Sequence, residues 1–196
     1  MTVFSLDPAA MPIGYGEAIL PLDHAKQHLR VDATDEDSLI ALLRDAAVDL
    51  VERYCSIPLG PRSGFVWQGA NGCFVAGSPV HLGVHPVTAI ISIDAIDATG
   101  ATITALATDF TIGPHDRLQP KPTKEWPDAT GGATIIFDAG YGAGEAGTKV
   151  PGLVAAVRLF LGHLYENREA VATHGIEGEI PLGVMFACAR YRMPAI

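Results

Sequence analysis

Apolar residues recur at helical spacing near the amino-terminal end of the chain. From Pro21 to Arg30 they return at intervals of three and four residues on one face, which predicts a short helix. A longer helix is expected to begin after a cap at Thr34 or Asp35 and to end by about residue 56, because Pro58 and Gly60 follow. Its predicted apolar stripe consists of Leu39, Leu43, Ala46, Leu50 and Tyr54.

The same spacing returns in the carboxyl-terminal part of the chain. Pro151 stands where a first-turn proline belongs, and the helix that it opens is expected to run to Glu169. The apolar stripe of this helix consists of Val154, Val157, Leu161 and Leu164. After a polar, glycine-bearing segment, a short final helix is expected to start near Pro181 and to end by Tyr191.

Between Phe65 and Asp138 the apolar pattern changes to the alternation that is typical of strands. The candidate strands are FVW, CFV, VTAIISIDAI, ATITAL, DFTIG and ATIIFDA. The segment DATGA, residues 97–101, is expected to join two of them as a hairpin. The segment from Pro114 to Gly132 has too many prolines for a central strand, so we expect a long exposed loop that orders only on docking.

These elements predict an α+β fold with two parts. Residues 1–60 and 139–196 are expected to form a helical bundle with a C-terminal extension. Residues 61–138 are expected to form a β-rich insert that carries the long Pro-rich loop.

Composition and charge restrict the classes of function. Hydrophobic residues make up 48% of the 196 residues and charged residues 18%, so a packed core is expected. The formal net charge of −9, with no basic run, argues against sequence-independent binding of nucleic acid. No signal peptide or long apolar segment is apparent, which favours a protein of the reducing cytoplasm without a membrane anchor.

The three cysteines lack the spacing of a metal or redox site. Cys55, Cys73 and Cys188 are odd in number and form no C-x-x-C pair, so we expect three small buried apolar side chains.

One glycine-rich segment resembles a phosphate-binding motif. Gly142, Gly144 and Gly147 spell G-x-G-x-x-G, and Thr148-Lys149 comes within one transposition of a P-loop ending. A dinucleotide-binding unit, however, needs a helix that starts inside the motif and a second strand after it, and no strand pattern follows. Glu145 would also place a negative charge among the phosphates. A flexible strand-to-helix connection is the preferred interpretation, and a nucleotide-binding enzyme using Gly142–Gly147 is the alternative.

Other candidate chemistry is sparse. His24 and His28 have a spacing that could share a metal, and Asp32 lies four residues further. The helix is expected to stop before Asp32, however, and no zincin glutamate accompanies the histidines, so two solvated side chains are expected. His81 and His85 flank a glycine in a segment better explained as a loop. No catalytic, metal or cofactor site is predicted, and we do not expect an enzyme.

Two clusters of aromatic and charged residues are candidates for protein contacts. The first is YENRE, with Tyr165 and Arg168 at the end of the long helix; the second is Arg190, Tyr191 and Arg192 near the end of the chain. Tyrosine and arginine anchor many interfaces because they combine contact area with directed hydrogen bonds. An ordinary helix end and a frayed terminus explain the same residues equally well.

The order of the segments resembles the head-tail connector (adaptor) proteins of tailed bacteriophages and gene transfer agents. The segments that carry the resemblance over residues 20–192 are LDHAKQHLRVD, LIALLRDAAVDLVERYCSIPL, HPVTAIISIDAIDATGA, FDAGYG, VPGLVAAVRLFLGHLYENREAV and IPLGVMFACARYR. The family often has Leu-Pro before the Pro-Val that stands here at Pro86-Val87, whereas this chain reads HLGVH, so the loop shape is expected to differ there.

The resemblance implies a structural protein assembled in the bacterial cytoplasm and located in the neck of a phage or phage-like particle. It implies a ring, commonly of twelve copies, that lies under the portal protein, lengthens the DNA channel and docks a tail-side stopper. Residues 190–196 would then reach toward the portal, and Tyr165, Arg168, Arg190, Tyr191 and Arg192 would lie at contacts with a neighbouring subunit or the portal. A different tail-completion or stopper protein is a second alternative.

Overall fold

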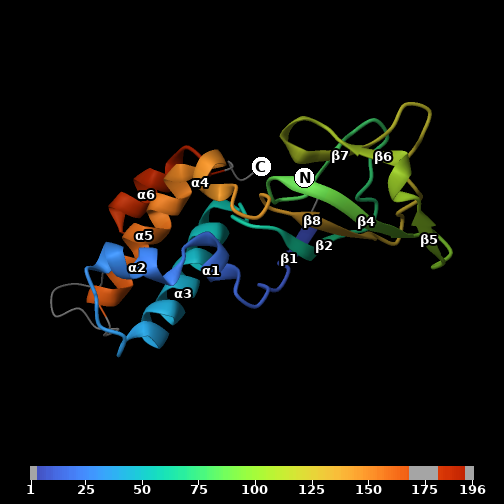
Figure 1. The fold of residues 1–196 in the computed structure, drawn as a ribbon. Helices are drawn as coiled ribbons and strands as arrows, with labels where there is room; N and C mark the ends of the chain where they lie inside the picture. Colours follow the sequence, from blue (N-terminus) through green and yellow to red (C-terminus); the bar gives the residue numbers. More distant parts are fainter. Residues whose placement is uncertain (1–3, 168–180, 193–196) are drawn as a thin grey trace. The chain divides into compact units, whose positions relative to one another are not determined.

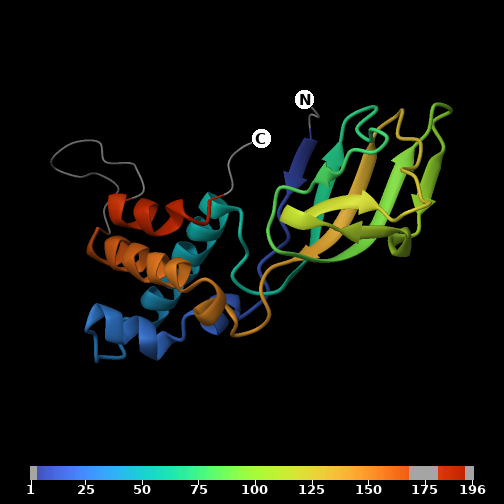
Figure 2. The same ribbon diagram turned by 90° about the horizontal axis from the view of Figure 1, so that it is seen from above.

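The computed structural model describes residues 4–167 and 181–192 of the chain, and it divides them into two compact units (Figures 1 and 2). The sheet unit contains the described residues of Met1–Met11 and Pro61–Gly140. The helical unit contains those of Pro12–Gly60 and Tyr141–Ile196. The expected α+β class is confirmed.

The helical unit is built around two long helices. Its helices are α1 (Tyr15–Ile19), α2 (Leu22–Leu29), α3 (Asp37–Cys55), α4 (Ala146–Lys149), α5 (Pro151–Glu166) and α6 (Leu182–Ala189). Helix α5 lies between α6 and α2 in both views, and it also packs on α3 (Figures 1 and 2). The expected short helix after Pro21, the helix opened by Pro151 and the final helix after Pro181 are all present.

The apolar stripe predicted for α3 was wrong. The residues that α3 buries include Ile40, Ala47, Val48, Val51 and Cys55. The predicted row, Leu39, Leu43, Ala46, Leu50 and Tyr54, is only half-buried or exposed. Both rows have helical spacing, and burial selects the row with more small and β-branched side chains, which allow α5 to pack closely.

The sheet unit contains two antiparallel sheets. The five-stranded sheet has the order β1 (Phe4–Asp7), β2 (Arg62–Gly69), β8 (Ala133–Ala139), β4 (Val87–Ile96) and β5 (Thr102–Ala105). The three-stranded sheet has the order β3 (Val80–His81), β7 (Arg117–Pro120) and β6 (Phe110–Ile112). Short 3₁₀ turns at Ala107–Asp109 and Pro114–Asp116 flank β6.

One hydrophobic core joins the two sheets. Trp67, Ile135 and Phe137 from the large sheet belong to the same buried cluster as Leu118 and Phe110 from the small one. Along β8 every second residue is buried, as expected for a strand with one face on a core. Figure 2 shows the small sheet lying over one face of the large sheet.

The interpretation of residues 114–132 as a loop was wrong in part. Strand β7 lies inside this segment and is the central strand of the small sheet, pairing with both β3 and β6. Its Leu118 is fully buried. The prolines stand at or beyond the ends of β7, where they interrupt little pairing, and this is why the proline count was misleading.

Two further expectations about strands need correction. Residues 4–7 form β1, which pairs with β2, so residues 4–11 lie in the sheet unit rather than with the helices. The segment CFV, residues 73–75, is not a strand; Cys73 is buried and Phe74 stacks on Trp126 instead. All three cysteines are buried free thiols, as expected.

Candidate interaction surfaces

The glycine segment 142–147 connects β8 to α5, and one of its backbone amides binds a glutamate of the same segment. The Gly142 amide donates a hydrogen bond to Oε2 of Glu145 at 3.3 Å, so a carboxylate stands on an amide that a phosphate would need. Gly144 has a φ of +75°, which favours glycine at this turn. The four-residue α4 begins at Ala146, inside the motif, whereas the first helix was expected only at Pro151; no strand lies beyond it in the described residues.

The histidines that sequence analysis considered do not form a metal site. His28 Nε2 lies 3.6 Å from the position that a Cβ on Gly162 would occupy, so this side chain lies against α5. His85 pairs through Nδ1 with the Asp116 carboxylate, which also accepts a hydrogen bond from the Val87 amide at 3.1 Å. Within residues 4–167 and 181–192, no three histidine, cysteine, aspartate or glutamate side chains are placed to hold a metal ion.

None of the described helices combines the length and the apolar character that a membrane crossing requires.

Tyr165 makes a contact inside the helical unit. Its hydroxyl donates a hydrogen bond to Oε2 of Glu36, the residue before α3 begins. The side chain therefore joins the end of α5 to the start of α3. Its predicted companion, Arg168, lies outside the described residues.

The three C-terminal candidates lie together at the end of α6. The Arg190 guanidinium lies 4.8 Å from the centre of the Tyr191 ring, and Arg192 lies 4.8 Å from the centre of the Tyr54 ring at the end of α3. Tyr191 is half-buried, whereas both arginines are exposed. Tyr165 lies about 20 Å further along α5 than Gly152, which Tyr191 contacts, so the structure separates the two predicted clusters.

A pair of thiols fixes the inner side of α6. Cys55 near the end of α3 donates a hydrogen bond to the sulfur of Cys188, and this bond together with burial raises the pKa of the Cys55 thiol. Both side chains are buried, so they join α6 to α3 as part of the core.

The outer side of α6 is a surface that sequence analysis missed. Leu182 is 72% exposed and Phe186 is 77% exposed, although both stand on a helix that is apolar throughout. The sequence LGVMFACA indicates such a surface, because its eight residues include no charged or strongly polar side chain to face the solvent. A second exposed apolar row lies on α3, where Leu42 is 66% exposed and Leu50 is 39% exposed.

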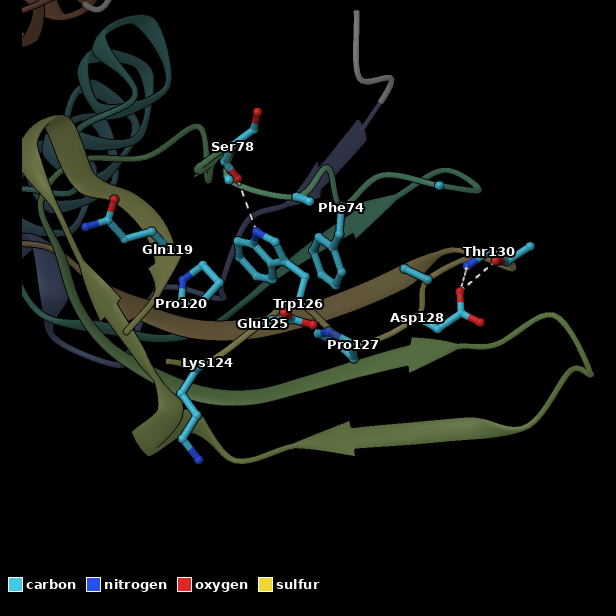
Figure 3. A pocket seen from close by; sticks show the side chains of 14 residues that line it. Phe74, Ser78, Gln119, Pro120, Lys124, Glu125, Trp126, Pro127, Asp128 and Thr130 are labelled. Carbon is cyan, nitrogen blue, oxygen red and sulfur yellow. Dashed lines mark hydrogen bonds between the residues drawn. The ribbon is translucent and has the colours of Figure 1, made fainter. Parts of the chain in front are cut away.

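The sheet unit has a pocket of about 550 Å³ between residues 72–78 and 119–130 (Figure 3). Trp126 lies in its wall, stacked on Phe74 with ring centres 4.3 Å apart, and its Nε1 donates to the Ser78 carbonyl at 3.1 Å. Lys124 pairs with Asp109, and Asp128 accepts hydrogen bonds from Thr130. These charged groups hold the surrounding loops.

Comparison with known proteins agrees with the resemblance drawn from the sequence. Residues 20–81 match the family model described as "Phage gp6-like head-tail connector protein". A comparison with curated proteins gave no match.

Solved structures extend the likeness to nearly the whole chain. A chain from the "neck of empty GTA particle computed with C6 symmetry" has 26% sequence identity and a TM-score of 0.71, over 98% of this chain and 97% of that chain. A chain from the "neck of native GTA particle computed with C12 symmetry" has 25% identity and a TM-score of 0.66, over 100% and 97%. A chain from the "virion of native gene transfer agent (GTA) particle" has 25% identity and a TM-score of 0.67, over 97% and 96%. The resemblance to head-tail connector proteins is therefore confirmed, and it supports a structural connector role.

Proposed function

We propose that this chain forms a homo-oligomeric ring, with twelve copies the expected number, in the neck of a phage or gene transfer agent particle. The ring lies beneath the portal protein, lengthens the DNA channel and docks a tail-side stopper. The observation that carries this proposal is the likeness to neck chains over 98% of the sequence, in both units of the fold.

Charge supports a channel that DNA passes through rather than binds. The formal net charge is −9, and Lys and Arg are outnumbered by Asp and Glu, 13 against 22. Each phosphate contact by a basic side chain strengthens binding and would retard a moving duplex. A wall with few such contacts is therefore suited to DNA transit.

The C-terminal cluster is our candidate for contact with the portal or a neighbouring subunit. Arg190 and Arg192 are exposed, and each stacks on a tyrosine that holds its guanidinium in place. Tyr165, at the other end of α5, remains a candidate and also supports the start of α3. Arg168 remains a candidate from the sequence.

Electron microscopy of particles from a producing strain tests the proposal. A tag on this chain should be labelled at the head–tail junction, and averaging with cyclic symmetry should show twelve copies. Cells that lack the chain should accumulate heads without tails. Label on the head surface or the tail tube would overturn the proposal, and a smaller ring would favour a different neck component.

A further inference from the structure

Helix α6 is apolar on every side, but the part of the chain that the structure describes covers only one of them. Val184 and Cys188 are buried, whereas Leu182 and Phe186 lie one turn apart on the outer side and are 72% and 77% exposed. Helices without a polar face are normally covered all round by other protein. Side chains of this size and exposure mark an interaction surface.

The outer row of α6 ends in a positive charge. Leu182, Phe186 and Arg190 follow one another at intervals of four residues, so they lie along one side of the helix and its C-terminal turn. Arg190 is exposed, and its guanidinium stacks on the ring of Tyr191.

A matching row lies on α3. Leu42, Ala46 and Leu50 have the same spacing of four residues; both leucines are exposed and Ala46 is half-buried. Asp49 stands next to Leu50, and its half-buried carboxylate pairs with Nε of the exposed Arg53 at 2.8 Å. This row therefore also combines an apolar strip with charged groups at its edge, and one of them, the Asp49 carboxylate, has the opposite sign to Arg190.

The two rows cannot meet within one molecule. Helix α6 contacts α3 through Cys188 and Cys55. Ala46 lies nine residues before Cys55, about two and a half helical turns, so it lies on the opposite side of α3. Two different, complementary patches on opposite sides are what a head-to-tail ring interface requires.

We propose that the α6 row Leu182–Phe186–Arg190 packs against the α3 row Leu42–Ala46–Leu50 of a neighbouring copy of this chain, with Arg190 beside Asp49. The inference rests on the proposed ring and identifies its subunit interface. Copies that each carry a formal charge of −9 repel one another, so cohesion between them has to come from apolar area and from local pairs of opposite charge. These two rows supply both.

Variants of this chain in purified particles test the proposed α6–α3 interface separately from the proposed ring. Phe186→Asp and Leu42→Asp should each lower the copies of this chain per particle by about tenfold or more, because losing a central interface anchor costs at least a decade of affinity. Phe186→Leu is the matched control and should assemble as the wild type does. The exposure of both positions predicts unchanged melting of the free protein, which circular dichroism checks.

A charge exchange tests the pairing of the two rows. Arg190→Asp should reduce incorporation, and adding Asp49→Arg should restore it. A loss of incorporation with Phe186→Asp but not with Leu42→Asp would mean that α6 binds another protein. Full incorporation of both variants would mean that neither row is an interface. Either result overturns this inference but leaves the proposed ring intact. Absence of the wild-type chain from particles would instead overturn the proposed function.

Discussion

The ring of Tyr191 lies against the backbone of Gly152 in the first turn of α5. A Cβ placed on Gly152 would lie 2.8 Å from Cε2 of Tyr191 and 3.0 Å from its hydroxyl oxygen, so the glycine is needed for this approach. With Arg190 on the same ring, the contact attaches the end of α6 to the start of α5. The stacking of Arg190 on Tyr191 and of Arg192 on Tyr54 holds the C-terminal cluster in place.

We expect Gly152→Ala and Tyr191→Ala to be strongly non-additive in stability. In the wild-type background, Gly152→Ala should raise the free energy of unfolding by up to about 1 kcal/mol through helix propensity. Displacement of the Tyr191 ring should cancel or reverse this gain. In the Tyr191→Ala background the space is free, and Gly152→Ala should stabilise the protein by up to about 1 kcal/mol. Urea unfolding of the four variants measures the coupling, and additive effects would show that the ring does not rest on Gly152 in solution.

A buried carboxylate is expected to be the polar centre of the helical unit. Glu52 is 3% exposed, and its Oε1 accepts hydrogen bonds from the Tyr15 hydroxyl and the Leu59 amide, both at 2.6 Å. Glu52→Ala should lower the free energy of unfolding by about 2–4 kcal/mol, because it leaves buried donors without their acceptor. Tyr15→Phe should lower the free energy of unfolding by about 1–2 kcal/mol. Helical signal during chemical denaturation measures both, and Glu166→Ala on the exposed end of α5 is the control; a Glu52 variant as stable as this control would contradict the assignment.

The sequence predicted best those elements whose local pattern and tertiary environment agree. VTAIISIDAI and ATIIFDA became β4 and β8 with the expected content, and Asp97–Ala101 joins β4 to β5 as a hairpin. Pro151 opens α5, with Val157 and Leu161 buried. In each case the turn chemistry and the periodicity favour the same structure.

The sequence failed where a local pattern fits two tertiary solutions. On α3, two apolar rows had equal periodicity, and only the packing of α5 decides which row is buried. Strand β7 is too short and too close to prolines to be recognised, because its stability comes from pairing on both sides. The outer row of α6 was not identified because a helix that is apolar throughout has no periodicity that distinguishes its buried side from its exposed side.

Two aspartates in matching turns should titrate below their ordinary range. Asp97 Oδ1 accepts a hydrogen bond from the Thr99 hydroxyl at 2.7 Å, and Asp128 Oδ1 accepts one from the Thr130 hydroxyl at 2.6 Å. Together with backbone amides, these bonds favour the charged form and lower the pKa of both carboxyl groups below 3.8. Because each folded-state pKa is depressed, the stabilisation is present above the ordinary value and is lost as the pH falls through the lowered one.

NMR titration of the carboxyl carbons measures this shift. Thr99→Ala should raise the pKa of Asp97 and change that of Asp128 little, whereas Thr99→Ser should retain the low pKa of Asp97. An unchanged Asp97 pKa in Thr99→Ala would show that the hydroxyl is not responsible.

The glycine segment should not bind nucleotides. Glu145 already occupies the Gly142 amide, so a phosphate would have to displace a carboxylate and then lie beside its charge. Equilibrium dialysis against NAD and ATP should give no saturable binding. Glu145→Gln is the matched variant, since it removes the charge of the side chain and keeps its size. Tight nucleotide binding by the wild type that is lost in Gly144→Asp would instead support an enzyme.

Strand β7 should be resistant to proteolysis in the free protein, whereas the sequence predicted that its segment orders only on docking. Arg117 lies in β7 with Leu118 fully buried beside it, whereas Lys124 follows the strand and is exposed. Trypsin should therefore cut after Lys124 well before it cuts after Arg117, because cleavage requires local opening of the sheet. Leu118→Ala should lower the free energy of unfolding by about 2–5 kcal/mol and accelerate cleavage after Arg117. Leu106→Ala is the control, because Leu106 is 67% exposed, and it should have neither effect. Mass spectrometry of early digestion products distinguishes the two sites, and equally early cleavage at both in the wild type would mean that β7 is not formed before assembly.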